Sequence, residues 1–176
     1  MDQKDTFKKV GIASAIMMAS VFLSRITGVL REMAIAGIGG VKAEVDAYQV
    51  AFVIPEILNH IAASGFLSIT FIPILTHYLA RNEEAEGWRI FSLILNVFGF
   101  FLLIFIIVSM FFAPSLVALF APGIDNPATF GLAVRMTRII IPAQFFFFTG
   151  GLFMAVQFAR EQFYIPALAP LIYNIC

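Results

Sequence analysis

The chain has very little charge and almost no cysteine. Only 12% of its 176 residues are Asp, Glu, Lys or Arg, against about 25% in ordinary soluble domains. The 11 basic and 11 acidic residues cancel, so the net charge does not point to nucleic acid or to a purely electrostatic partner. The single cysteine, Cys176, allows neither a disulfide framework nor a cysteine metal site. We also find no phosphate-binding glycine loop, no zinc spacing and no nucleophile with its base. We therefore expect neither an enzyme nor a bound metal or cofactor.

Apolar residues are what the chain has in excess. They make up 61% of the sequence, against about 45–50% in soluble domains. Residues 90–124 and 139–159 contain no charged side chain, and about 20 apolar residues suffice to span a bilayer as a helix. The sequence therefore predicts an all-α, polytopic transmembrane helix bundle.

Five helices are predicted within one transmembrane domain that covers residues 1–176. Their approximate ranges are 7–38, 46–80, 88–113, 128–158 and 166–176. Glycines 37, 39 and 40 should end the first helix, as glycine commonly does. Pro114 and the range 121–127 predict a turn-rich connection between the third and fourth helices. The last range is too short to cross a bilayer of about 30 Å, so we expect the chain to belong to a longer protein.

The second range is too long for one straight crossing, at roughly 50 Å for 1.5 Å per residue. Pro55, the Ser64-Gly65 pair and Pro73 are the predicted kink points, because proline removes a helix hydrogen bond and Gly/Ser pairs accompany bends.

The distribution of basic residues predicts the orientation of the helices. Lys4, Lys8, Lys9, Arg81, Arg89 and Arg160 fall on one side of the predicted membrane, and Lys42 lies in a loop on the other. Cytoplasmic loops carry the excess of Lys and Arg, which predicts a cytoplasmic N-terminus. A signal peptide cleaved near Ala34 to Ala36 is the less favoured alternative, because charged residues interrupt the apolar run before that site.

The first helix carries Arg25, Arg31 and Glu32 inside an otherwise apolar span. Each ionisable residue costs about 2.5–3.5 kcal/mol there on insertion scales, so it usually faces a bundle interior or a water-filled path. Gly28 lies between the two arginines and leaves the backbone accessible. One interpretation is an anion site, because guanidinium groups form paired hydrogen bonds with phosphate oxygens. The alternatives are an internal Arg–Glu pair that joins helices and an interfacial position for Arg31 and Glu32.

The second helix carries a polar stripe on one face. On an ideal wheel it consists of Asp46, Gln49, Glu56, His60 and Ser64, with Asn59 adjacent. Such a stripe lines either a hydrated cavity or a polar seam between helices, and Glu56 and His60 favour the cavity. The same two residues are also candidates for a proton-coupling pair. On the fourth helix, Arg135 and Arg138 are either site residues or interfacial arginines that snorkel.

Residues 24–32, Ser-Arg-Ile-Thr-Gly-Val-Leu-Arg-Glu, resemble the S-R-x-x-G-x-x-R-[DE] signature of MurJ/MviN lipid II flippases, in the MOP exporter superfamily. Further landmarks match at compatible spacing. They are Asp46-Ala47-Tyr48, Ala51-Phe52 with Pro55, Gly65, residues 71–75, Ala121-Pro122-Gly123, Arg138 with Pro142, and residues 165–170.

The resemblance implies about fourteen helices in two lobes around a central cavity. This sequence would supply the first four helices and the start of the fifth, in the amino-terminal lobe. It further implies a place in the bacterial inner membrane, a role in cell-wall biogenesis, lipid II or another polyprenyl-pyrophosphate-linked substrate, contact with membrane lipids, and alternating access. The membrane potential and a monovalent ion are the candidates for driving transport.

The resemblance and the polar stripe together predict the substrate-binding residues. They are Arg25, Arg31, Glu32, Asp46, Asn59, His60 and Ser64, with Ser24, Gly28, Glu56 and Arg138 as additional candidates. Where many members have two arginines and then a glutamate on the second helix, this chain has Asn59-His60 and Ser64, so the anion site loses two fixed positive charges. The alternative functions are a related exporter of polysaccharide lipids or of drugs, and an envelope scaffold that does not transport.

Overall fold

The computed structural model describes residues 3–40, 42–61 and 70–175. These residues form eight helices, and no strand occurs among them. The helices are α1 Gln3–Gly39, α2 Ala43–Ile61, α3 Ile72–Ala80, α4 Glu84–Phe111, α5 Ala113–Phe120, α6 Pro127–Ile140, α7 Ala143–Ala159 and α8 Tyr164–Ile175. The predicted all-α class is confirmed.

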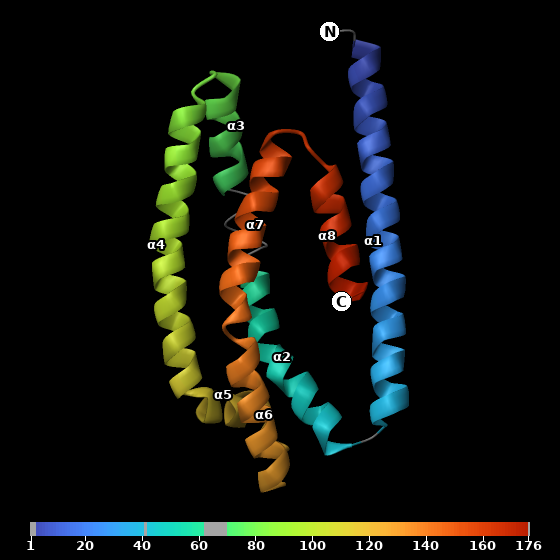
Figure 1. Cartoon of the computed structure of the whole chain (residues 1–176), viewed down its shortest axis with the longest axis vertical. Coiled ribbons are helices and arrows are strands. Elements are labelled where there is room, and N and C mark those ends of the chain that lie inside the picture. The colour runs from blue at the N-terminus through green and yellow to red at the C-terminus, as the bar shows by residue number, and fades with distance from the viewer. Residues whose placement is uncertain (1–2, 41, 62–69, 176) are drawn as a thin grey trace.

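The helices form two neighbouring groups (Figure 1). α1 runs along most of the height of the molecule and packs mainly along α8, whereas α3, α4 and α7 pack against one another on the far side. α2 packs on α6 and crosses the space between the groups at its lower end. The beginning of α1, the α3–α4 connection and the α7–α8 connection lie at one end of the molecule, and the α1–α2 connection lies at the other.

The first helix ends within one residue of its predicted end. Gly40 follows it with φ of 60°, and its N–H donates to the carbonyl oxygen of Ala36 at 2.9 Å. This bond from a left-handed residue is typical of helix ends, and glycine adopts that backbone conformation without steric cost.

In the structure, the two long predicted ranges contain α2 with α3 and α6 with α7. α2 remains helical through Pro55, and π-helical geometry at Thr70 and Phe71 precedes α3. Ser64 and Gly65, another predicted kink point, lie outside the described residues. The predicted helix 128–158 is divided into α6 and α7 by a turn at Ile141 and Pro142. Proline causes such a break because it has no N–H and its ring crowds the carbonyl four residues earlier.

α5 corrects the predicted turn-rich connection after Pro114, because residues 113–120 are helical. Pro114 lies in the first turn of α5, where its missing N–H would have no helical partner in any case. The proline therefore starts a helix here, and the turn is confined to the residues that follow Phe120.

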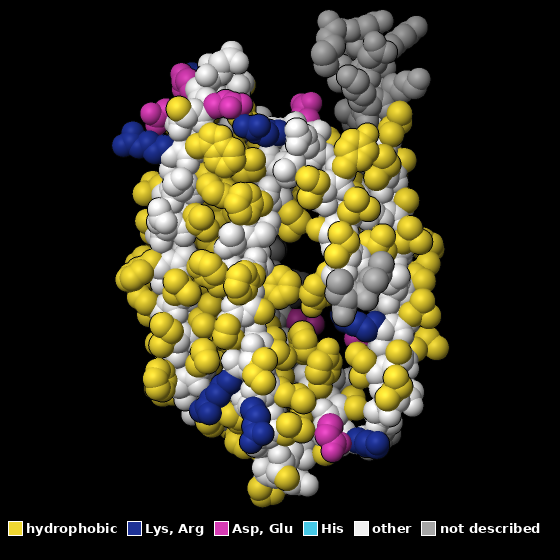
Figure 2. Space-filling view, in the orientation of Figure 1, with side chains coloured by type: hydrophobic (Ala, Val, Ile, Leu, Met, Phe, Trp, Pro, Cys, Tyr) yellow, Lys and Arg dark blue, Asp and Glu magenta, His cyan; other side chains and the backbone are white. Residues whose placement is uncertain are grey.

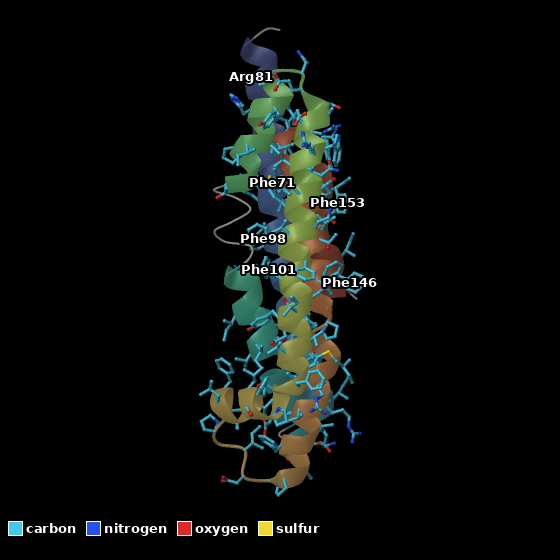
Figure 3. The ribbon with its side chains drawn as sticks, turned by 90° about the vertical axis from the view of Figure 1, so that its left-hand side faces the viewer. Phe71, Arg81, Phe98, Phe101, Phe146 and Phe153 are labelled. Atoms are coloured by element: carbon cyan, nitrogen blue, oxygen red, sulfur yellow. The ribbon has the colours of Figure 1, made fainter. Side chains whose placement is uncertain are left out.

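A cluster of apolar side chains holds α3, α4 and α7 together. Its buried members are Phe71 and Leu75 of α3 and its preceding turn, Phe91 and Ile94 of α4, and Phe148, Leu152, Ala155, Val156 and Ala159 of α7. Aromatic rings contact one another within it and at its edge: Phe91 lies 6.3 Å from Phe71 and 5.2 Å from the half-exposed Phe153, measured between ring centres. In Figure 3, Phe71 and Phe153 lie on opposite sides of α4.

The outer surface has the character of a membrane protein. α4 and the range Pro127–Ala159, which α6 and α7 share, are long and apolar enough to cross a bilayer. Figure 2 shows apolar side chains over most of the visible face, with charged side chains gathered at the two ends. A further charged group is visible midway, where α8 ends beside α1.

Candidate anion-binding site

α1 and α8 meet along a line of small and polar residues. We call this line the α1–α8 seam; it consists of Ser20, Ser24 and Gly28 of α1 and Ala167, Pro170 and Asn174 of α8. The spacing of four places the three α1 residues on one face of the helix, and small residues allow two helices to approach closely in a membrane.

Hydrogen bonds connect the two sides of this seam. The Ser20 hydroxyl donates to the carbonyl oxygen of Ala167, and the Ser24 hydroxyl donates to that of Pro170 at 3.0 Å. The Asn174 amide nitrogen donates to the carbonyl oxygen of Ser24 at 2.9 Å and to its hydroxyl oxygen at 2.7 Å. The seam therefore fixes the position of α8 along α1.

An open pocket of about 660 Å³ lies beside this seam. The polar and small residues that line it include Ser24, Arg25, Gly28, Arg31 and Glu32 of α1, and Asn174 of α8. Five candidates predicted from the sequence thus come together in one pocket. Because two lining residues are arginines and one is a glutamate, the lining carries a net positive charge.

Arg31 is held from two directions. Its Nη2 donates to Glu32 Oε1 at 3.1 Å, and its guanidinium carbon lies 5.9 Å from the centre of the Tyr173 ring. Its side chain is 38% exposed, while its Nε is buried and has no hydrogen-bond partner among the described residues. α1 and α8 therefore converge at the Arg31 side chain.

Arg25 is exposed and forms no ion pair or hydrogen bond within the part of the chain that the structure describes. It lines the charged pocket and also a neighbouring apolar groove of about 380 Å³ along Met17, Met18, Val21 and Phe22. Its charge is therefore available to a ligand.

The predicted polar stripe is visible over the described part of α2. Asp46, Gln49 and Glu56 are exposed, and the opposite face carries the buried Ala47 and Ile54. Neither Asp46 nor Glu56 lines the charged pocket. The side chains of Asn59 and His60, and Ser64 entirely, lie outside the described residues.

Arg138 lies away from the pocket. Its Nε donates to the carbonyl oxygen of Met110 at 3.1 Å, in the last turn of α4, where carbonyl groups have no helical partner. Its observed contact thus joins α6 to α4. Arg135, one turn earlier, is exposed.

Sequence reasoning missed Tyr173 and Asn174 at this site. The spacing of Ser20, Ser24 and Gly28 is a signal for close approach of another helix. It does not say which helix approaches, so the residues that α8 contributes needed the structure.

Comparison with known proteins assigns the family. The model of the family described as "Lipid II flippase MurJ" matches residues 35–176. The chain belongs to the lipid II flippase MurJ family. The matched range begins after Glu32, so this assignment rests on the end of α1 and the helices that follow, independently of the arginines in the pocket. A flippase moves a lipid between leaflets, which makes this a family of transporters rather than of enzymes.

Individual MurJ relatives extend the match further into α1. The probable lipid II flippase MurJ of Buchnera aphidicola (subspecies Acyrthosiphon pisum) is 34% identical over 154 residues, or 87% of this chain and 30% of the relative. The lipid II flippase MurJ of Burkholderia cenocepacia is 32% identical over 92% of this chain and 32% of its own length.

The lipid II flippase MurJ of Thermosipho africanus is 29% identical over 93% of this chain and 33% of the relative. The unmatched 7% of this chain is shorter than the segment that precedes Arg25. The match therefore includes Arg25, Arg31 and Glu32. The chain spans about a third of the length of the curated relatives it matches.

Proposed function

We propose that the chain takes part in moving lipid II from the cytoplasmic to the outer leaflet of the bacterial inner membrane, with Arg25 and Arg31 holding the pyrophosphate group. The observation that carries this proposal is that both arginines line one pocket, inside a membrane-embedded chain of the MurJ family. Guanidinium groups stay charged at physiological pH and bind phosphate oxygens through paired hydrogen bonds.

The charge balance of the pocket supports an anionic ligand. Glu32 forms an ion pair with Arg31 at 3.1 Å, which leaves the charge of Arg25 uncompensated among the described residues. A pyrophosphate would supply the missing negative charge. Away from bulk water this attraction is screened less than at a protein surface.

The transport cycle we propose is alternating access. The head group enters the pocket from the cytoplasmic side while the polyprenyl tail remains in the bilayer, and rocking of the helices then opens the pocket outward. The N-terminus is cytoplasmic in this proposal, because the beginning of α1 shares its end of the molecule with the loops that contain Arg81 and Arg160. The membrane potential or a monovalent ion would drive the cycle. Direct substrate contacts of Asp46, Asn59, His60 and Ser64 stay predictions.

A growth experiment tests the transport proposal. The chain is grafted in place of the matching segment of the Thermosipho africanus relative, and the graft is expressed in a strain depleted of its own lipid II flippase. We expect the graft to support growth and Arg25→Ala or Arg31→Ala to abolish it at equal expression. Arg89→Ala is the matched control, because Arg89 is 80% exposed and pairs only weakly, at 3.7 Å, with Glu86. Normal growth with either pocket variant would contradict the proposal.

A binding experiment tests the substrate class. The chain in lipid nanodiscs is titrated with labelled lipid II, and three competitors are added: undecaprenyl pyrophosphate, inorganic pyrophosphate and ethidium. We expect both pyrophosphates to compete, with the lipid-linked one stronger. Competition by ethidium alone would instead indicate an exporter of organic cations.

A further inference from the structure

Tyr173 stands out because it connects the pocket to two helices at once. The guanidinium carbon of Arg31 lies 5.9 Å from the centre of its ring. The Tyr173 ring also packs edge to face with Phe147 of α7, at 5.7 Å between ring centres and an interplanar angle of 71°. Phe147, Tyr173 and Arg31 thus form a continuous contact from α7 through α8 to α1.

Glu32 alone does not fix the guanidinium group of Arg31. Adjacent residues on a helix do not face each other, and the one hydrogen bond between them leaves the guanidinium plane free to turn about it. The buried Nε of Arg31 adds no second anchor within the described residues. The Tyr173 ring supplies the missing restraint, because the negative face of an aromatic ring attracts a cation, more strongly away from water.

We propose that Tyr173 is a positioning residue, whose ring holds Arg31 so that its remaining N–H groups serve the anion pocket. The inference rests on the proposed function, since Arg31 must bind the pyrophosphate for its orientation to matter. α8 thereby has a role in substrate binding beyond its hydrogen bonds to Ser24. A ring that only filled space would act through its size, whereas a ring that holds a cation acts through its electron density.

The experiment varies electron density at nearly constant size. Residue 173 is replaced by phenylalanine and by its mono-, di- and trifluorinated analogues, and the affinity of the chain in nanodiscs for undecaprenyl pyrophosphate is measured. We expect Tyr173→Phe to stay within about twofold of the original chain and affinity to fall stepwise with each fluorine. Tyr173→Leu, which has no ring, should bind about tenfold more weakly.

Two controls give every outcome a meaning. The same fluorinated series at Phe147, which touches the ring of Tyr173 but makes no cation–π contact with Arg31 in the described part of the chain, should leave affinity unchanged. Arg31→Ala is measured in parallel. If Arg31→Ala binds as well as the original chain, the proposed function is wrong. If Arg31→Ala loses binding while the fluorinated series at 173 is flat, the proposed function stands and the role of Tyr173 is overturned.

Discussion

Different interactions hold the helices together within each of the two helix groups. α3, α4 and α7 meet through aromatic rings and branched apolar side chains, with Leu152 fully buried at their centre. α1 and α8 meet through hydrogen bonds: Asn174 donates to Ser24, and the Ser24 hydroxyl donates to the carbonyl oxygen of Pro170. In lipid there is no hydrophobic force between helices, so the first group depends on van der Waals packing and the second adds hydrogen bonds.

This difference separates the structural part of the chain from the part that binds. An apolar cluster offers no group that recognises an ion. The α1–α8 seam already contains polar groups, and the pocket with Arg25 and Arg31 lies directly beside it. The contrast predicts that the apolar cluster dominates stability and that the seam and its pocket dominate binding.

Truncation in the apolar cluster should have the largest effect on stability. Leu152 is completely buried, so Leu152→Ala should lower the free energy of unfolding by about 2 kcal/mol. This value is at the lower end of the usual range, because in a membrane the side chain is not transferred from water when the helices pack, and only the cost of the cavity remains. Unfolding by SDS in detergent micelles, followed by circular dichroism, measures this change. Leu168→Ala is the control, because Leu168 is 49% exposed and should change stability little. Equal losses in both variants would contradict the packing of this cluster.

Much of this fold was predictable from sequence, since long apolar ranges and glycines report on helices directly. The all-α membrane class followed from the uncharged ranges around α4 and α7. The division at Pro142 and the helix α5 were not predicted, because the effect of a proline depends on whether it falls inside a helix or in its first turn. Both cases look alike in an apolar sequence.

The candidate site was predictable on α1 and much less so elsewhere. Arg25 and Arg31 are costly in lipid and so indicate a function from sequence alone. The contribution of α8 depends on which helix packs against α1, and tertiary packing decides that. Arg138 illustrates the reverse case, because its sequence position left two interpretations open and its contact with Met110 is a helix-end hydrogen bond.

Breaking the seam should have a smaller effect than truncating the apolar cluster. A double-mutant cycle with Ser24→Ala and Asn174→Ala should give a coupling energy of about 0.6–1.7 kcal/mol, the range for hydrogen bonds between membrane helices. The same SDS titration measures it. The pair Thr76→Ala and Asn174→Ala is the control, because the Thr76 hydroxyl bonds within its own helix and should show no coupling. A coupling energy near zero for Ser24 and Asn174 would show that their hydrogen bonds do not stabilise the α1–α8 seam.

The ion pair between Arg160 and Glu84, which joins the end of α7 to the start of α4, should contribute less to stability than the seam. Arg160 Nη2 lies 3.2 Å from Glu84 Oε1, and its guanidinium carbon lies 5.7 Å from the centre of the Trp88 ring. The two side chains of the ion pair are 35% and 60% exposed, so Arg160→Gln should lower stability by at most about 1 kcal/mol, and less at high salt. Repeating the titration at low and high salt checks both statements. A loss that is unchanged by salt would assign the effect to the stacking on Trp88.

The smallest effect is expected at Gly28, and it measures how closely α1 and α8 approach. A Cβ atom placed there would meet Asn174 Oδ1 at 3.6 Å, an ordinary van der Waals contact. The better helix propensity of alanine should offset the cost of placing a methyl group beside a polar atom, so Gly28→Ala should change stability by less than about 0.5 kcal/mol. If Gly28→Ala destabilised the chain as much as Leu152→Ala, the helices would have to lie closer than this, and small size at residue 28 would be as important to the α1–α8 seam as its hydrogen bonds.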